Sequence, residues 1–225
     1  MKEKRIVREY AVALDVGDRE SAISLASKFK DKFAFAKIGL ELFTAVGPSI
    51  IPEVKELGYR VFLDLKLHDI PNTVRGATLS CARYGVDLLS VHCVGGIEMM
   101  KAAVEAANSV DGGPSIIGVT QLTSLPPLAV ESLTERLSLI VESGAHGFVS
   151  SGLEVDTIKS RFPDLLAVVP GVRYEMSNLG DQVRVVTPSD AFRSGANLVV
   201  LGRILQGVDD VDRVLALLER DRSEI

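Results

Sequence analysis

The stretch Arg60–Ile70 reads RVFLDLKLHDI, and it decides how the rest of the chain is interpreted. Its first part, Arg60–Leu67, is apolar enough to predict a buried strand, yet it carries Asp64 and Lys66 two residues apart. Because side chains alternate between the faces of a strand, both charges are expected on the same face. Burying two charges is costly unless partners compensate for the lost water, and Asp69 offers Lys66 a second partner. The stretch therefore indicates a structural ion pair or an active site, and we favour the active site.

Similar apolar runs recur along the whole chain and alternate with helix-length amphipathic segments. Strands are predicted at Tyr10–Val16, Phe35–Gly39, Arg60–Leu67, Leu88–Val94, Ile116–Leu122, Gly147–Ser151, Ala167–Val172 and Leu198–Gly202. Helices are predicted at Asp18–Lys30, Glu41–Leu57, Asn72–Tyr84, Ile97–Asn108, Leu128–Ser143, Glu154–Arg161, Thr187–Arg193 and Val208–Glu219. Continuously apolar strands that alternate with helices indicate a parallel sheet covered by helices.

Eight such units in 225 residues predict an α/β protein with the (β/α)8 TIM-barrel fold. The main alternative is an open, doubly wound sheet. Residues 1–225 contain no linker, low-complexity tract or change in composition, so a single domain is expected.

Composition excludes several classes of function. A net charge of −5 argues against a nucleic-acid-binding surface. No apolar run reaches the roughly 18 residues of a membrane span, and the charged N-terminus is not followed by a signal-type apolar segment. Cys81 and Cys93 are too few for a disulfide framework. We therefore expect a cytoplasmic protein that binds neither nucleic acid nor membranes.

Polar residues gather where the predicted strands end, and in TIM barrels the catalytic residues occupy these C-terminal ends. They are Asp15, Lys37, Asp64, Lys66, Asp69, His92, Thr120, Thr123, Arg173 and Arg203. Together they predict a polar mouth in which cations and carboxylates face one another. Asp64, His68 and Asp69 could instead bind a hard metal ion, but the charge of Lys66 among them argues against a cation.

The last two predicted strands indicate a phosphate site. The loops after strands seven and eight often bind phosphate in this fold. Here they carry Pro170-Gly171-Val172-Arg173 and Gly202-Arg203. Glycine lets backbone N–H groups approach an anion closely, and arginine supplies a bidentate fork.

The ten residues Asp64–Thr73, DLKLHDIPNT, resemble the signature of the orotidine 5′-phosphate decarboxylase family. Shorter stretches resemble the family's other motifs in the family's order: Ala13–Asp15, Lys37–Gly39, Val91–Gly96, Leu122–Ser124, Pro170–Arg173, Gly180–Gln182 and Val200–Arg203. The resemblance implies a homodimer of (β/α)8 barrels that converts orotidine 5′-monophosphate to UMP and carbon dioxide, the last step of UMP biosynthesis. It implies neither a cofactor nor a metal.

The resemblance also implies roles for the catalytic residues. Lys66 would donate the proton to C6 of the pyrimidine, Asp64 would lie beside the leaving carboxylate, and Lys37 would connect Asp64 to the ribose. The residues expected to reach the partner subunit's site are Asp69, Ile70 and Thr73.

For substrate binding, the resemblance assigns Asp15 to the ribose hydroxyls and Thr123 to the pyrimidine. The phosphate would be held by Arg173, Gln182 and Arg203, with Pro170 and Gly202 beside it, and the loop Val172–Gln182 would close over it. Gln121 departs from the family pattern, which leaves open which neighbouring hydroxyl contacts the base.

Two alternative functions are weighed against this one. A keto-sugar-phosphate decarboxylase or aldolase would use Asp-x-Lys-x-x-Asp around magnesium, but Ile70–Thr73 resembles the nucleotide-specific form. A non-catalytic nucleotide-phosphate-binding barrel would be expected to lose Lys66 or Asp64.

Overall fold

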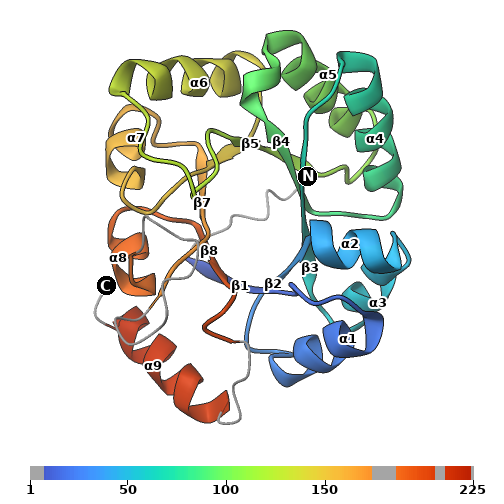
Figure 1. Cartoon of the computed structure of the whole chain (residues 1–225), viewed down its shortest axis with the longest axis vertical. Coiled ribbons are helices and arrows are strands. Elements are labelled where there is room, and N and C mark those ends of the chain that lie inside the picture. Colours follow the sequence, from blue (N-terminus) through green and yellow to red (C-terminus); the bar gives the residue numbers. More distant parts are fainter. Residues whose placement is uncertain (1–7, 174–185, 206–210, 224–225) are drawn as a thin grey trace.

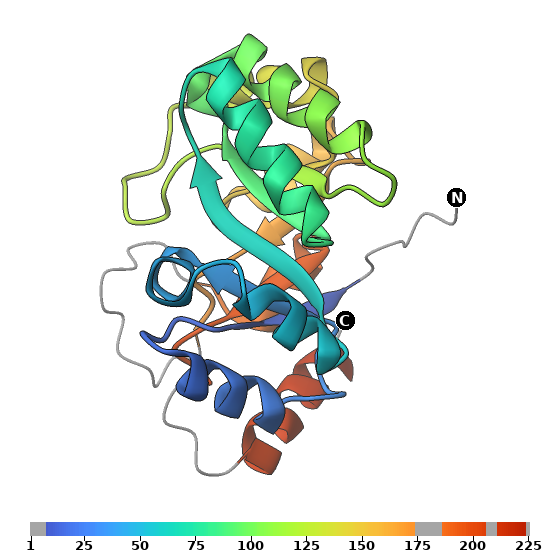
Figure 2. The same ribbon diagram turned by 90° about the vertical axis from the view of Figure 1, so that its right-hand side faces the viewer.

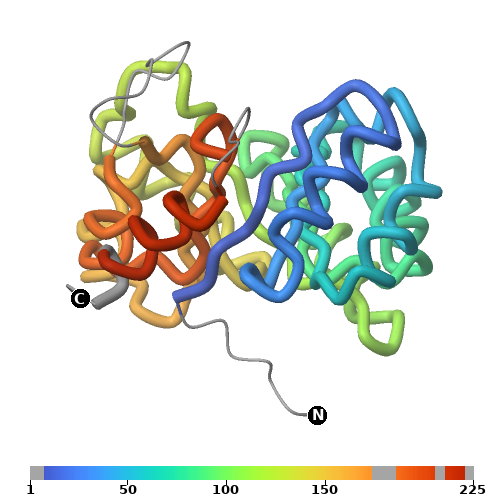
Figure 3. Tube along the Cα trace, turned by 90° about the horizontal axis from the view of Figure 1, so that it is seen from below, coloured from blue at the N-terminus to red at the C-terminus, as the bar shows by residue number. Residues whose placement is uncertain are grey.

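The protein is described by a computed structural model covering residues 8–173, 186–205 and 211–223. Its strands form a closed parallel barrel in which spatial order follows chain order. The strands are β1 (Glu9–Ala13), β2 (Phe35–Gly39), β3 (Arg60–Leu67), β4 (Leu88–His92), β5 (Ser115–Val119), β6 (Gly147–Val149), β7 (Leu166–Val169) and β8 (Leu198–Leu201). The first strand pairs with both the second and the last. In Figure 3 the dark blue N-terminal segment runs between the red C-terminal part and the lighter blue part of the chain. The predicted barrel is confirmed, and the open sheet is excluded.

Helices surround the barrel on all sides (Figure 1). They are α1 (Arg19–Lys28), α2 (Leu40–Val46), α3 (Ile50–Glu56), α4 (Pro71–Arg83), α5 (Ile97–Asn108), α6 (Val130–Glu142), α7 (Val155–Arg161), α8 (Pro188–Arg193) and α9 (Val211–Ser223). A short 3-10 helix, η1 (Cys93–Gly95), follows β4. Within the described ranges, no helix is both long enough and apolar enough to cross a membrane.

Alternation along the strands creates two apolar layers. One set of side chains packs between the strands and the helices, and the other fills the barrel interior. The interior set is Ala11, Ala13, Phe35, Phe62, Leu88, Ile117, Val119, Val149, Val168, Leu198 and Val200. The barrel is therefore a packed core, and an open site can form only above this filling.

The predicted helix Glu41–Leu57 is wrong, because the chain forms α2 and α3 there. Gly47 ends α2 with a φ of 77°, a left-handed conformation that glycine adopts without strain. Pro48 follows, and a proline disfavours helical backbone in the residue before it. The break leaves α2 directly after β2, close to the barrel mouth.

Several predicted strands extend too far at their C-terminal ends. The first stops at Ala13 rather than Val16, and the fifth stops at Val119 rather than Leu122. Asp15 and Thr123 therefore lie on loops that follow the strands. By contrast, β3 matches its predicted bounds and is the longest of the described strands; Figure 2 shows it, in teal, running along the side of the barrel.

Candidate active site

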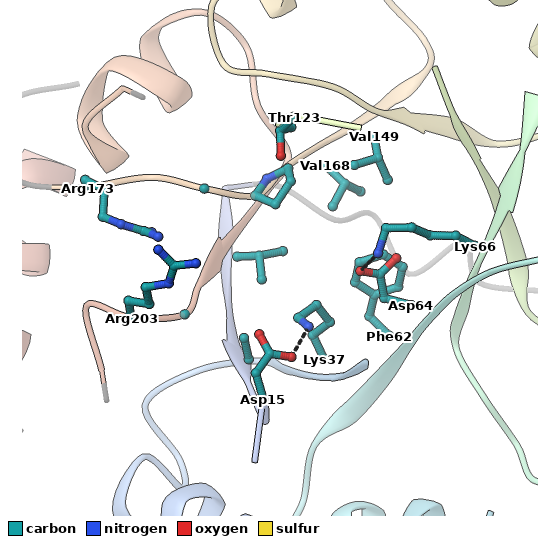
Figure 4. A pocket seen from close by; sticks show the side chains of 15 residues that line it. Asp15, Lys37, Phe62, Asp64, Lys66, Thr123, Val149, Val168, Arg173 and Arg203 are labelled. Carbon is teal, nitrogen blue, oxygen red and sulfur yellow. Dashed lines mark hydrogen bonds and ion pairs between the residues drawn. The ribbon is translucent and has the colours of Figure 1, made fainter. Parts of the chain in front are cut away.

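A pocket opens above the apolar filling, at the C-terminal ends of the strands (Figure 4). Five interior residues form its apolar part: Ala13, Phe62, Val149, Val168 and Val200. The predicted site residues that line it are Asp15, Lys37, Asp64, Lys66, Thr123, Pro170, Arg173, Gly202 and Arg203. Gly171 completes the lining. Parallel strands point the same way, so residues far apart in sequence meet here as predicted.

Two ion pairs occupy one side of the pocket. Lys66 Nζ donates to Asp64 Oδ2 at 2.7 Å, and Lys37 Nζ donates to Asp15 Oδ1 at 2.6 Å. Asp64 and Lys37 are only 9% and 7% exposed, so water screens their charges weakly. Alternating cations and carboxylates allow four charges to share a half-buried site.

Asp64 is the most buried acid of this group, and its ionisation depends on its neighbours. Burial raises the pKa of its carboxyl group, but the ammonium groups of Lys66 and Lys37 act in the opposite direction. Hydrogen bonds from Lys66 and Ser90 add to that effect, and the pKa lies below its ordinary value. Asp64 is therefore a carboxylate at neutral pH.

The backbone at Lys66 is not that of a regular strand. Its φ is 51°, in the left-handed region that a non-glycine residue rarely adopts. The pairing with β4 is irregular here, because Leu63 pairs with Leu89 while Leu67 pairs with Val91. Simple alternation was therefore the wrong reason for placing both charges on one face, although both do point into the pocket (Figure 4).

Ser90 takes part in this arrangement, and sequence reasoning assigned it no role. Its hydroxyl accepts a hydrogen bond from the backbone N–H of Lys66 at 2.8 Å. The same hydroxyl donates to Asp64 Oδ1 at 2.8 Å. The only signal in the sequence is a polar residue within the apolar strand β4.

Gly39 is a second residue whose role was missed, although its motif was recognised. A Cβ atom on Gly39 would lie 2.9 Å from Asp15 Oδ1 and 2.9 Å from Lys37 Nζ. Both distances are too short for a normal contact. The Lys37–Asp15 ion pair therefore occupies space that only glycine leaves free.

Two arginines occupy the other side of the pocket. Arg173 follows β7 and is buried, whereas Arg203 follows β8 and is exposed. Figure 4 shows their guanidinium groups pointing toward each other. Arg173 is held in place because one of its guanidinium N–H groups donates to the Val172 carbonyl at 2.8 Å. Two converging cations provide a suitable site for an anion.

Three predicted site residues, all within the described ranges, do not line this pocket. Asp69, Ile70 and Thr73 are exposed at the start of α4, and Asp69 Oδ1 accepts the N–H of Ile70 at 2.6 Å. Gln182 and most of the predicted closing loop lie outside the described residues.

Two other polar residues of the predicted mouth face elsewhere. Thr120 is buried and donates to the Val149 carbonyl at 3.1 Å. His92 is half-buried, with its ring 5.6 Å from that of His68. The suggested metal site at Asp64, His68 and Asp69 is not formed, since the described ranges hold no group of three or more His, Cys, Asp or Glu residues that could hold a metal ion.

Comparisons with known proteins agree with this geometry. Residues 9–216 match the family model described as Orotidine 5'-phosphate decarboxylase / HUMPS family. A protein of Maridesulfovibrio salexigens named orotidine 5'-phosphate decarboxylase is 45% identical over 215 residues, 90% of this chain and 93% of its own length. One of the same name from Cutibacterium acnes is 42% identical over 211 residues, 88% of this chain and 89% of its own length.

Solved structures show the same similarity in three dimensions. The crystal structure of orotidine 5'-phosphate decarboxylase from Lactobacillus acidophilus has a TM-score of 0.81 and 30% identity, covering 95% of this chain and 98% of its own. An uncharacterised conserved protein from Geobacillus kaustophilus has a TM-score of 0.79 and 36% identity, covering 94% of this chain and 99% of its own.

Gly39→Ala is expected to separate Lys37 from Asp15 while leaving the barrel folded, because the clashing atoms are the ends of flexible side chains. We expect a loss of about 1–3 kcal/mol in the free energy of unfolding. A crystal structure should show the Lys37–Asp15 distance increased beyond hydrogen-bonding range.

Gly17→Ala is the matched control, because its Cβ would meet only Glu41 Oε1 at an ordinary 3.8 Å. Its unfolding free energy should change by less than about 0.5 kcal/mol. An unaltered ion pair in Gly39→Ala would contradict the assignment.

Proposed function

Because this chain belongs to the orotidine 5'-phosphate decarboxylase / HUMPS family, we propose that it converts orotidine 5′-monophosphate to UMP and carbon dioxide in pyrimidine biosynthesis. The observation that carries the proposal is the Lys66–Asp64 pair at one side of a pocket whose other side holds two arginines. A substrate with a phosphate at one end and a reacting carboxylate at the other matches this distribution of charge.

The remaining lining suits the middle of a nucleotide. A flat pyrimidine can pack on the apolar side chains of Phe62, Val149 and Val168, with Thr123 offering a hydroxyl to its polar edge. We assign the ribose hydroxyls to Asp15 and Lys37. The phosphate is assigned to Arg173 and Arg203, with the glycine and proline backbone at Pro170 and Gly202 beside it and Gln182 as a further ligand.

Lys66 is assigned the central chemical role. When the bond between C6 and the carboxylate breaks, carbon dioxide leaves and the electron pair stays on C6 in the ring plane, where no carbonyl group delocalises it. At roughly 4 Å and an effective dielectric constant near 20, an ammonium stabilises such a charge by about 4 kcal/mol. Lys66 then gives a proton to C6, which yields UMP and a neutral amine that recovers a proton from water.

Asp64 and Lys37 support this step. Asp64 accepts from Lys66 Nζ at 2.7 Å and so fixes the position of the ammonium. We also assign its carboxylate a position beside the carboxylate that leaves, where the two negative charges would repel. Lys37, which contributes to the low pKa of Asp64, connects this group to the ribose site.

The arginines lie across the pocket from Lys66, so in this assignment phosphate binding acts on the reaction indirectly. Binding energy from a non-reacting group can orient the substrate and hold its base against Lys66. An apolar interior beneath the pocket gives this orientation a rigid support.

We further propose that the active unit is a homodimer in which Asp69, Ile70 and Thr73 complete the partner's site. In their own subunit these residues are exposed and outside the pocket lining. Ile70 is 67% exposed, which is unusual for a large apolar side chain beside a polar mouth. Exposed apolar residues also occur on other loops and helix ends: Leu40, Val94, Leu125 and Leu153.

Lys66→Ala is expected to lower kcat by a factor of about 10³ or more, which is the rate equivalent of about 4 kcal/mol. Turnover is followed by the absorbance change of orotidine 5′-monophosphate, with and without EDTA, beside the exposed Lys28→Ala as control. Wild-type and control turnover should be equal and insensitive to EDTA. No wild-type turnover, or turnover that EDTA abolishes, would contradict the proposal and favour a magnesium-dependent keto-sugar-phosphate enzyme.

Arg203→Ala is expected to weaken UMP binding by roughly 10- to 100-fold, because a hydrogen-bonded charge pair is lost. Uridine, which lacks the phosphate, should bind both enzymes equally. Inhibition constants of UMP and uridine measure this, and Arg193→Ala is the control since Arg193 pairs with Asp190 on α8. Equal losses for UMP and uridine would place the phosphate elsewhere.

The two homodimers Lys66→Ala and Asp69→Ala are both expected to be nearly inactive, while the heterodimer of the two chains regains activity. One of its sites then carries an intact Lys66 and an intact Asp69 from the partner, so about half of the wild-type activity per dimer should return. Co-expression with two affinity tags isolates the heterodimer. An inactive heterodimer would mean that Asp69 acts within its own subunit.

A further inference from the structure

We propose that Ser90 is a positioning residue that holds the Asp64–Lys66 pair in its reactive geometry. This inference rests on the proposed decarboxylase function and extends it to a residue outside the pocket lining. Ser90 lies on β4 and is fully buried, so its hydroxyl exchanges no hydrogen bonds with bulk water.

The Ser90 hydroxyl connects two parts of the site that would otherwise be independent. It accepts the backbone N–H of Lys66 and donates to the carboxylate of Asp64, both at 2.8 Å. A hydroxyl has one proton to donate, so the carboxylate receives that proton and a lone pair receives the N–H. The second oxygen of Asp64 in turn holds Lys66 Nζ at 2.7 Å. Ser90, Asp64 and Lys66 thus form a closed ring of hydrogen bonds.

The backbone of Lys66 depends on this ring. Its φ of 51° is unfavourable for a residue with a side chain, and the regular pairing of β3 with β4 is interrupted between Leu63 and Leu67. At this irregularity the Lys66 N–H donates to a side chain of β4, the hydroxyl of Ser90. Without the hydroxyl, this N–H would lose its partner, and the left-handed conformation would lose a contact that stabilises it.

The backbone of Lys66 and the carboxylate that binds its ammonium group are therefore both held by one atom. Ser90 Oγ fixes the backbone from which the Lys66 side chain starts and the carboxylate to which its Nζ is bound. A small displacement at Ser90 would move the ammonium relative to C6 of the substrate. Misplacing a reacting group by about 1 Å can cost about 100-fold in rate.

The test compares Ser90→Ala with Ser90→Thr, which keeps the hydroxyl. Ser143→Ala is the control, because Ser143 is also buried and its hydroxyl donates to the Ile140 carbonyl at the end of α6, outside the pocket. For Ser90→Ala we expect kcat to fall by about 10- to 100-fold. The inhibition constant of UMP, which reports the phosphate and ribose contacts, should change less than about threefold. Ser90→Thr should keep most of the wild-type kcat, and Ser143→Ala should keep all of it.

The pH profile of kcat gives a second measurement that a purely structural role would not change. The Ser90 hydrogen bond is one of the contacts that hold the pKa of Asp64 low, so its loss raises that pKa. The ionised carboxylate is the active form, and activity is lost as pH falls through its pKa. Ser90→Ala should therefore lose activity at a higher pH on the acid side than the wild type does.

Each outcome decides between two interpretations. Ser90 is merely structural if Ser90→Ala lowers the melting temperature but leaves kcat per folded site unchanged. In that case the pH at which activity is lost on the acid side should also be unchanged. Equal losses in Ser90→Ala and Ser90→Thr would also overturn the proposal. If Ser90→Ala does not fold, Ser90→Cys replaces it, and full kcat with this weaker donor would contradict the inference. A wild type without turnover removes the proposed function itself, and this inference with it.

Discussion

The structure depends on keeping a buried carboxylate ionised at the mouth of the barrel. Asp64 is 9% exposed, and burial alone would favour its neutral form. Two ammonium groups reverse that preference, and each needs a counter-charge of its own, which for Lys37 is Asp15. None of these side chains could be removed without leaving a charge that the low-dielectric surroundings penalise. The four charges are therefore one unit, and the chain around them is shaped to hold it.

The barrel supports these four charges with an apolar interior beneath them and with the strands that carry them. Inward-facing apolar residues fill the interior and exclude water beneath the charges, while consecutive strands bring Lys37, Asp64 and Ser90 to one end. Gly39 leaves the space for the Lys37–Asp15 pair, and the irregular pairing of β3 directs Lys66 into the pocket. Local strain at Lys66 is tolerated because Ser90 holds its N–H and because β3 pairs with β4 both before and after the irregularity.

Sequence reasoning reached the architecture because alternation of apolar strands and amphipathic helices is a repeated, local signal. It reached the pocket because parallel strands bring their C-terminal ends together, so Asp15, Lys66 and Arg203 had to meet. It could not predict the left-handed φ of Lys66 or the role of Ser90, which arise from the register between two strands.

The break between α2 and α3 was visible as Gly47-Pro48 and should have been predicted. The position of Asp69 in the partner's site requires a second chain and stays a prediction.

The two roles proposed for Lys66 differ in how strictly they fix its position. With an effective dielectric constant near 20, moving the ammonium from about 4 to about 5 Å lowers its stabilisation of a charge from about 4 to about 3.3 kcal/mol, roughly a fourfold change in rate. Proton transfer is less tolerant, since the donor must come within hydrogen-bonding reach of C6. A carbanion that receives no proton can recombine with carbon dioxide before the gas escapes. In the proposed mechanism, the requirement for proton delivery, more than electrostatic stabilisation, accounts for a Lys66 that is held from its backbone and from its Nζ at the same time.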